Sequence, residues 1–205
     1  EAAVKARKNP ESVAKWQCIE IQLTGPVSQG KGEPNPFEIL VDVAFTSPGG
    51  KEYIMPGFYD GDGKGGLDGS VWKVRFSADE TGIWKFTSKS NNTMLDACKG
   101  SLTVTPSSKD AQDFYKWGRL ESVATPINNI RYLKFREGPY WMKAGCDDPE
   151  NFLGNLSSYN NNIKRKEAID YLSAKGINSL YIMTHTLDGD GKDVWPWLGT
   201  DAKEA

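Results

Sequence analysis

The sequence predicts a β-sandwich of immunoglobulin type followed by an α/β segment, the start of a (β/α)8 barrel. Two observations lead to this prediction. Between residues 15 and 106, short alternations of apolar and polar residues recur at regular spacing with turn-forming residues between them, as in a sandwich. After residue 130, a hairpin, a helical pattern and a continuous apolar run follow one another, as in a unit with parallel strands. We therefore expect a sandwich at 15–106, a junction at 107–130 and an incomplete barrel at 131–205.

The predicted sandwich strands each place apolar side chains on one face, because alternate residues of a strand share a face. Residues 1–14 are polar and predict no element, and "DETGIWKF" at 79–86 has the form of a corner that leads into a late sandwich strand. The alternating apolar residues are, in chain order, Ile19, Ile21, Leu23, Phe37, Ile39, Val41, Val43, Phe45, Trp72, Val74, Phe76, Trp84, Phe86, Leu102 and Val104.

The second half of the chain has a different pattern. Residues 131–135 and 140–145 flank "REGP" and predict a hairpin. Residues 165–176 predict a helix that ends at Gly176, with apolar residues on one side. The apolar run at 177–183 predicts a strand that is buried on both faces.

A complete (β/α)8 barrel takes about 250 residues, and this chain has 205 residues in all. We therefore expect the chain to be the N-terminal piece of a longer protein. The alternative is a complete small α/β domain packed on the sandwich.

The composition limits the classes of partner. With 25 basic and 27 acidic residues, the net charge of −2 indicates no attraction to nucleic acid. No apolar run approaches the roughly 20 residues of a membrane span. Cys18 and Cys98 lie near the two ends of the predicted sandwich; they form a disulfide in an oxidising compartment or, with Cys146, are free thiols.

The string "DGDGK" occurs at 60–64 and at 188–192. A helix–loop–helix calcium site needs oxygen ligands at loop positions 5 and 12, but counting from Asp60 these positions hold Lys64 and Val71. Both copies fail this pattern, and turn chemistry explains them. A looser calcium cage at Asp60, Asp62 and Asp68 is the alternative, and no other cofactor is expected.

Candidate substrate contacts lie in two loops, because ligands of parallel α/β folds bind at the carboxyl ends of the strands. One loop comes after the hairpin, and the other comes after the run at 177–183. Acidic and amide groups can bind sugar hydroxyls, and tryptophan rings match the C–H faces of a pyranose. The candidates are Asp147, Asp148, Glu150, Asn151, His185, Trp195 and Trp197.

Each candidate also has a structural interpretation. The aspartates before Pro149 can cap a turn, the tryptophans can pack a long loop, and His185 can belong to a polar network. Asp147 and Asp148 are sequence neighbours rather than a carboxylate pair across a cleft. The sequence therefore identifies no catalytic residue.

Five strings together resemble secreted bacterial glycoside hydrolases with an immunoglobulin-like N-terminal domain and a (β/α)8 barrel of the apiosidase-like, cellulase-like superfamily. Members of this group are often described only as glycoside hydrolases or as collagen-binding proteins. The resemblance covers about residues 15–200. Its strings are "PNPFEILVDVAFTSPGG", "GFYDGDG", "WKVRFSADETGIWKFTSKSN", "RYLKFREGPYWMKAGCDDPENFLG" and "DVWPWLG".

The resemblance implies hydrolysis of a plant or algal polysaccharide, outside the cytoplasm or at the cell surface, by two carboxylates on strands beyond this chain. It also implies that the loops 146–151 and 185–197 border the substrate cleft. The rival interpretation is a non-catalytic module that binds carbohydrate or protein through the sandwich, with or without calcium.

Overall fold

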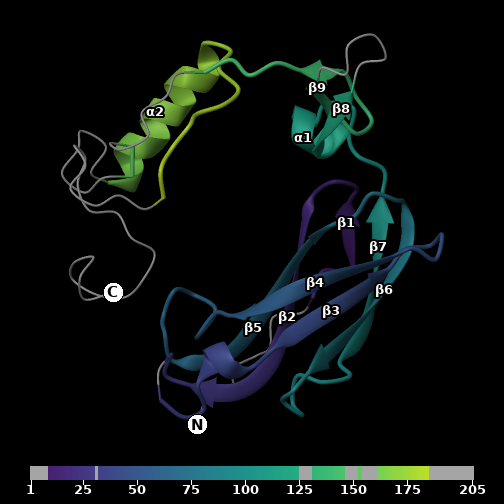
Figure 1. Ribbon diagram of the computed structural model, residues 1–205, viewed down its shortest axis with the longest axis vertical. Coiled ribbons are helices and arrows are strands. Elements are labelled where there is room, and N and C mark those ends of the chain that lie inside the picture. The colour runs from purple at the N-terminus through teal and green to yellow at the C-terminus, as the bar shows by residue number, and fades with distance from the viewer. Residues whose placement is uncertain (1–8, 31, 125–130, 146–151, 154–160, 185–205) are drawn as a thin grey trace. The chain divides into compact units, whose positions relative to one another are not determined.

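The computed structural model describes residues 9–30, 32–124, 131–145, 152–153 and 161–184. The chain divides into two compact units, Glu1–Tyr140 and Trp141–Ala205, which are considered separately (Figure 1). The domain boundaries expected from the sequence stay a prediction.

The first unit contains nine β-strands, a 3-10 turn and a short helix among its described residues, and β10 begins at its last residue. In chain order the elements are β1 (Ser12–Ala14), β2 (Cys18–Ser28), η1 (Pro36–Glu38), β3 (Val41–Thr46), β4 (Glu52–Tyr59), β5 (Gly69–Ser77), β6 (Gly82–Ser90), β7 (Lys99–Thr105), α1 (Asp113–Trp117), β8 (Leu120–Ala124), β9 (Arg131–Phe135) and β10 (Tyr140–Trp141). The strands β1 to β7 form one sheet in the order β1-β7-β6-β3-β4-β5-β2.

Strand β4 joins the two layers of this sheet. Its first half, residues 52–56, pairs with β3, and its second half, residues 57–59, pairs with β5. Pro56 and Gly57 lie where the strand changes partner, a place where a proline without an N–H is tolerated. Strand β4 is not predicted from the sequence, because a Pro-Gly pair is a turn signal.

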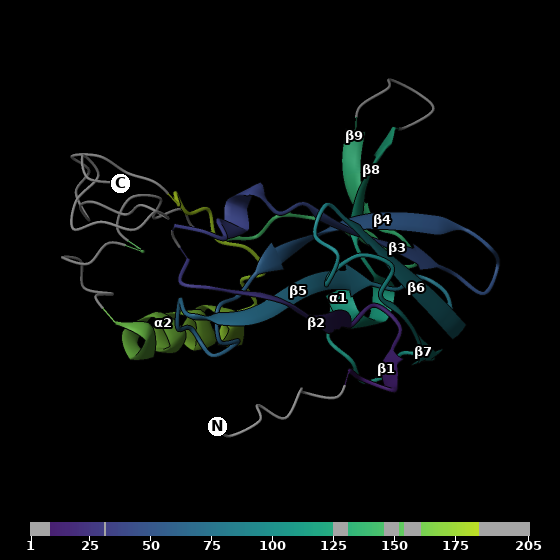
Figure 2. The same ribbon diagram turned by 90° about the horizontal axis from the view of Figure 1, so that it is seen from below.

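The core lies between the two layers of the large sheet, whose strands are seen in Figure 2. Phe45 of β3 stacks on Phe76 of β5 with ring centroids 4.5 Å apart, and the centroids of Phe76 and Trp84 of β6 are 5.0 Å apart. Burial of each such side chain contributes about 1.5–3 kcal/mol relative to exposure. All but two of the predicted inward residues are buried as expected. Phe37 and Ile39 are the exceptions, because η1 begins before β3 and leaves Phe37 exposed.

The predicted fold class is wrong. The seven strands form a single continuous sheet that curls into a nearly closed, barrel-like shape, rather than the two sheets of an immunoglobulin sandwich. The physical reason is the change of partner in β4, which carries the hydrogen-bond ladder from one layer into the other.

The predicted start of a (β/α)8 barrel is also wrong for the described residues. The expected helix is present as α2 (Asn162–Ala174), with Gly176 at φ 80° just after its end. The run at 177–183, however, forms no strand and contains no buried residue. The side-chain amide of Asn178 donates to the carbonyl of Met142 and accepts from the N–H of Ala144. In a parallel sheet these backbone groups of Met142 and Ala144 would instead bond to the backbone of a neighbouring strand.

A second, smaller sheet has the order β10-β9-β8. Strands β8 and β9 pair antiparallel, with Leu120 opposite Phe135 and Ala124 opposite Arg131. The predicted hairpin through "REGP" is confirmed, because β9 and β10 are neighbours. Figure 1 shows α1, β8 and β9 at the end of the large sheet where β7 ends.

The described cysteines, Cys18 and Cys98, are free thiols. Cys18 faces Ser77 at the end of β5, whereas Cys98 precedes β7 at the opposite end of the sheet, so the two sulfurs do not meet. Cys146 lies outside the described residues. None of the helices in the described ranges is long and apolar enough to span a membrane.

Candidate functional site

The seven substrate contacts expected from the sequence lie outside the described residues. These are Asp147, Asp148, Glu150, Asn151, His185, Trp195 and Trp197. Their role in substrate binding stays a prediction.

The described aspartates of the first "DGDGK" have other partners. Asp60 forms an ion pair with Lys73 at 2.7 Å, and Asp62 accepts hydrogen bonds from the backbone N–H groups of Lys64 and Gly66 at 2.7 and 2.9 Å. The N–H of Lys64, then that of Gly66, lowers the pKa of the Asp62 carboxyl. Within the described ranges, no three acidic, His or Cys side chains gather as a metal site. Calcium at Asp60, Asp62 and Asp68 therefore has no geometric support, and titration remains its test.

The outer face of β2 and β5 holds a small group of charges. Glu20 accepts from Lys73 at 3.1 Å and from Arg75 at 3.0 Å, and Lys73 is buried although it points away from the core. Burial raises the pKa of Glu20, but the hydrogen bonds from Lys73 and Arg75 outweigh it, and the net pKa is lowered. The hydrogen bond to Asp60, followed by the one to Glu20, raises the pKa of Lys73. These charges stabilise one another in the ionised state.

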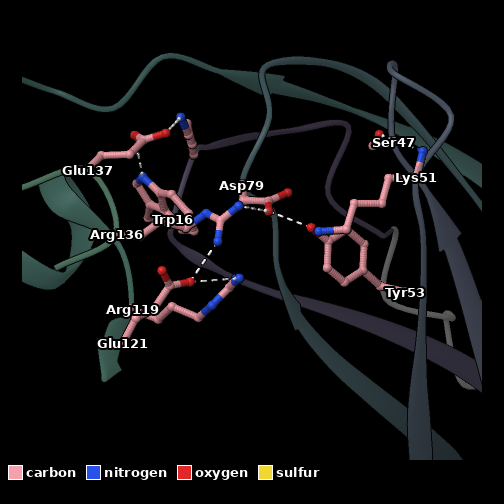
Figure 3. Close-up of polar contacts among 10 residues, drawn as sticks. Trp16, Ser47, Lys51, Tyr53, Asp79, Arg119, Glu121, Arg136 and Glu137 are labelled. Atoms are coloured by element: carbon pink, nitrogen blue, oxygen red, sulfur yellow. Dashed lines mark hydrogen bonds and ion pairs between the residues drawn. The ribbon is translucent and has the colours of Figure 1, made fainter. Parts of the chain in front are cut away.

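A larger polar group lies where the hairpin meets the large sheet, and we call it the junction network (Figure 3). Its members are Lys15, Trp16, Tyr53, Asp79, Arg119, Glu121, Arg136 and Glu137.

Arg136 is the centre of the junction network. Its guanidinium donates to Glu121 of β8 at 2.6 Å and lies 3.9 Å from Asp79, which comes after β5. Asp79 in turn accepts a hydrogen bond of 2.5 Å from the hydroxyl of Tyr53 on β4. Arg119 adds a second cation beside Glu121, at 3.2 Å. The small sheet is thus joined through Arg136 to Asp79 in the turn after β5, and Tyr53 of β4 holds the same carboxylate from within the large sheet.

Glu137 makes the second connection. Its carboxylate accepts from Lys15 at 2.6 Å and from the indole N–H of Trp16 at 3.1 Å. The Trp16 ring lies so close to Gly118 that a Cβ there would be 2.7 Å from a ring atom. Gly118 also has φ 86°, so this position favours glycine for both conformation and space.

The chemistry of the junction network is that of fixed ion pairs. The hydrogen bond from Arg136 lowers the pKa of Glu121, and the same bond raises the pKa of Arg136. A glycosidase acid needs a carboxyl with a raised pKa, held protonated opposite an ionised partner. Glu121 has the opposite perturbation, so we assign it to positioning rather than proton transfer.

Sequence reasoning missed the junction network, although its segments carried signals. Asp79 opens the predicted corner at 79–86, and Arg136 and Glu137 lie in the predicted "REGP" turn. Both segments read correctly as turns. Nothing in the sequence indicated that the two turns contact each other.

Comparison with known proteins adds three findings. Residues 12–91, from β1 to the end of β6, match a family model described as a domain of unknown function (DUF5060). The fold matches the crystal structure of a "putative glycoside hydrolase" from Bacteroides vulgatus ATCC 8482, with a TM-score of 0.61 and 18% sequence identity. The match covers 85% of this chain and 29% of that protein. None of the curated proteins compared matches the sequence.

Proposed function

We propose that this chain is the sheet-rich accessory portion of a glycoside hydrolase that acts on a plant or algal polysaccharide outside the cytoplasm. One observation carries the proposal: the fold agrees, over 85% of this chain, with 29% of a protein described as a putative glycoside hydrolase. The resemblance of the sequence strings to secreted hydrolases supports the same class and the same location.

In this proposal the large sheet is a rigid support for the hairpin. The junction network ties the hairpin to the sheet by charge-assisted hydrogen bonds, which are shorter and stronger than neutral ones. Arg136 and Glu137 are adjacent and reach two neighbouring segments of the sheet, Asp79 after β5 and Lys15 after β1. These two attachment segments are themselves hydrogen-bonded, Trp16 N–H to the carbonyl of Ala78, so the hairpin is held by one continuous patch of the large sheet.

Catalysis in the proposed enzyme is acid/base hydrolysis by two carboxylates, one of which acts as an acid with a raised pKa. Glu121 is paired with cations and has a lowered pKa, so the proposal places the acid elsewhere in the enzyme. The loops at 146–151 and 185–197 are proposed to bind the polysaccharide, with Trp195 and Trp197 as stacking surfaces.

The second candidate is a non-catalytic carbohydrate-binding module. It is favoured by the ion pairs of the junction carboxylates Asp79, Glu121 and Glu137, which engage these groups in holding the hairpin. The two candidates agree on the ligand and differ in whether bonds are broken.

The test is release of reducing sugar from a panel of xylan, mixed-linkage β-glucan, pectin and algal polysaccharides. Intact mass first establishes whether the native polypeptide exceeds the 22.7 kDa of this chain, and that native polypeptide is then assayed. We expect sugar release that falls at least tenfold in Trp195→Ala, since each tenfold loss corresponds to about 1.4 kcal/mol of transition-state binding.

The matched control is Phe37→Ala, which removes an exposed aromatic ring from η1, and it should retain full activity. Binding without sugar release would favour the non-catalytic module. If the polypeptide releases no sugar from the panel and binds none of its polysaccharides, the proposed function is overturned.

A further inference from the structure

The small sheet has one face that packs and one that does not. Phe135 of β9 is buried and meets Phe114 of α1 edge-on, with ring centroids 5.2 Å apart. Alternate residues of a strand point to opposite faces. Tyr132 and Lys134 therefore lie on the face opposite Phe135, away from this apolar contact.

This second face presents two tyrosine rings. Tyr132 of β9 is 49% exposed and Tyr140 of β10 is 61% exposed, and their rings lie 6.3 Å apart at 81° to each other. The ammonium of Lys134 lies 5.8 Å from the centre of the Tyr140 ring. We call Tyr132, Lys134 and Tyr140 the tyrosine face.

We infer that the tyrosine face is a carbohydrate-binding surface, an inference that rests on the proposed function and assigns it a contact site. Two rings at nearly a right angle form a corner in which the C–H face of a pyranose can lie on one ring with its edge against the other. Tyrosine suits this role because it combines an apolar ring face with a polar hydroxyl that hydrogen-bonds sugar hydroxyls.

Lys134 supplies a cation at the edge of this corner. It forms no ion pair with a carboxylate in the described part of the chain, so its three N–H groups are free to donate to a ligand. A sugar hydroxyl and the carboxylate of an acidic sugar are both suitable acceptors.

Two charged residues on the same side of the small sheet as Lys134 hold the two tyrosine rings in place. Glu121 lies opposite Lys134 in the β8–β9 register, and Arg136 lies two residues after Lys134, just past the end of β9. Both belong to the junction network, which ties the hairpin to the large sheet. The rings are thus carried on an anchored hairpin, and Figure 2 shows β8 and β9 of the small sheet extending beyond the edge of the large sheet. A preorganised surface loses less entropy when a ligand binds.

The test is affinity electrophoresis and titration calorimetry of the full chain with soluble xylan, mixed-linkage β-glucan and polygalacturonate. We expect at least one polymer to bind, and Tyr132→Ala and Tyr140→Ala each to weaken the affinity about tenfold. Tyr132→Phe and Tyr140→Phe keep the ring and should stay within about threefold of the wild type, since a single neutral hydrogen bond contributes little net free energy. Lys134→Met distinguishes the ligands, because it should weaken polygalacturonate binding and leave a neutral polymer nearly unchanged.

Tyr115→Ala is the matched control. Tyr115 lies on α1 and is 44% exposed, so its loss removes the same side chain without touching the tyrosine face. Retained affinity in both alanine variants, with unchanged melting temperatures, would overturn the inference. If the wild type binds no polymer while the native polypeptide still releases sugar, the tyrosine face is not a binding site and the proposed function stands.

Discussion

Replacing Tyr53 with phenylalanine removes one hydroxyl from the junction network and leaves the ring in place. The hydroxyl donates to Asp79 over 2.5 Å, and the Asp79 side chain is only 11% exposed. The ring keeps its contacts with Phe76 and Trp84, at centroid distances of 5.5 and 5.9 Å. The change therefore isolates a single hydrogen bond to a nearly buried carboxylate.

A hydrogen bond to a charged partner contributes about 1.5–3 kcal/mol. Because Arg136 remains 3.9 Å from Asp79 and continues to neutralise it, we take the lower end and expect a loss of about 1–2 kcal/mol. For a unit of this size that loss corresponds to a fall in melting temperature of about 3–8 °C. Thermal and urea unfolding followed by tryptophan fluorescence measure both quantities.

Tyr115→Phe is the matched control, because Tyr115 is exposed on α1, and it should change the stability by less than about 0.5 kcal/mol. The decisive measurement is a double-mutant cycle of Tyr53→Phe with Asp79→Ala. A coupling indistinguishable from zero would mean that the hydroxyl and the carboxylate do not interact, and the junction network as described would be wrong.

Three further predictions concern the large sheet. Gly25→Ala places a Cβ 2.5 Å from the indole nitrogen of the buried Trp72, so urea unfolding should show a loss of about 1–3 kcal/mol; an unchanged midpoint would exclude this close approach. Burial opposes ionisation of Glu20, but the hydrogen bonds from Lys73 and Arg75 prevail, and the pKa of Glu20 in the folded protein lies below the ordinary 4.5. The contribution of ionised Glu20 to the stability of the fold is therefore present above pH 4.5 and is lost as the pH falls through the folded pKa. Glu20→Gln should therefore flatten the acid side of the melting-temperature profile, and a profile parallel to the wild type would contradict this. Calcium should leave the melting temperature unchanged, because Lys73 occupies the Asp60 carboxylate; a calcium-dependent rise that Asp60→Ala abolishes would restore the calcium alternative.

The elements that the sequence predicts correctly are those that a local pattern decides. Period-two alternation identified five strands of the large sheet, and the inward residues Ile19, Ile21 and Val43 are fully or almost fully buried. The helix before Gly176 was found because its periodicity and its glycine end signal are local as well. The apolar run at 177–183 misled, because the same run of residues reads as a buried strand whether or not a partner strand is present.

The candidate site shows the same division. The turns that carry Asp79 and Arg136 were recognisable, but their meeting was not, since the two residues are separated by β6, β7, α1, β8 and β9. The tyrosine face was equally hidden. Tyr132 and Tyr140 lie on the two arms of the predicted hairpin, but only the packing of Phe135 on Phe114 shows which face of that hairpin is left exposed.

By itself, the sequence determined the strand-rich character of the first 106 residues, the inward face of its main strands, and the turns between them. These properties arise from side-chain periodicity and turn chemistry, which act over a few residues. The tertiary structure decided the sheet order, the change of partner in β4, and the joining of Tyr53, Asp79 and Arg136. Those features depend on which distant segments pack together, and packing is set by the complementarity of whole surfaces rather than by any short stretch of chain.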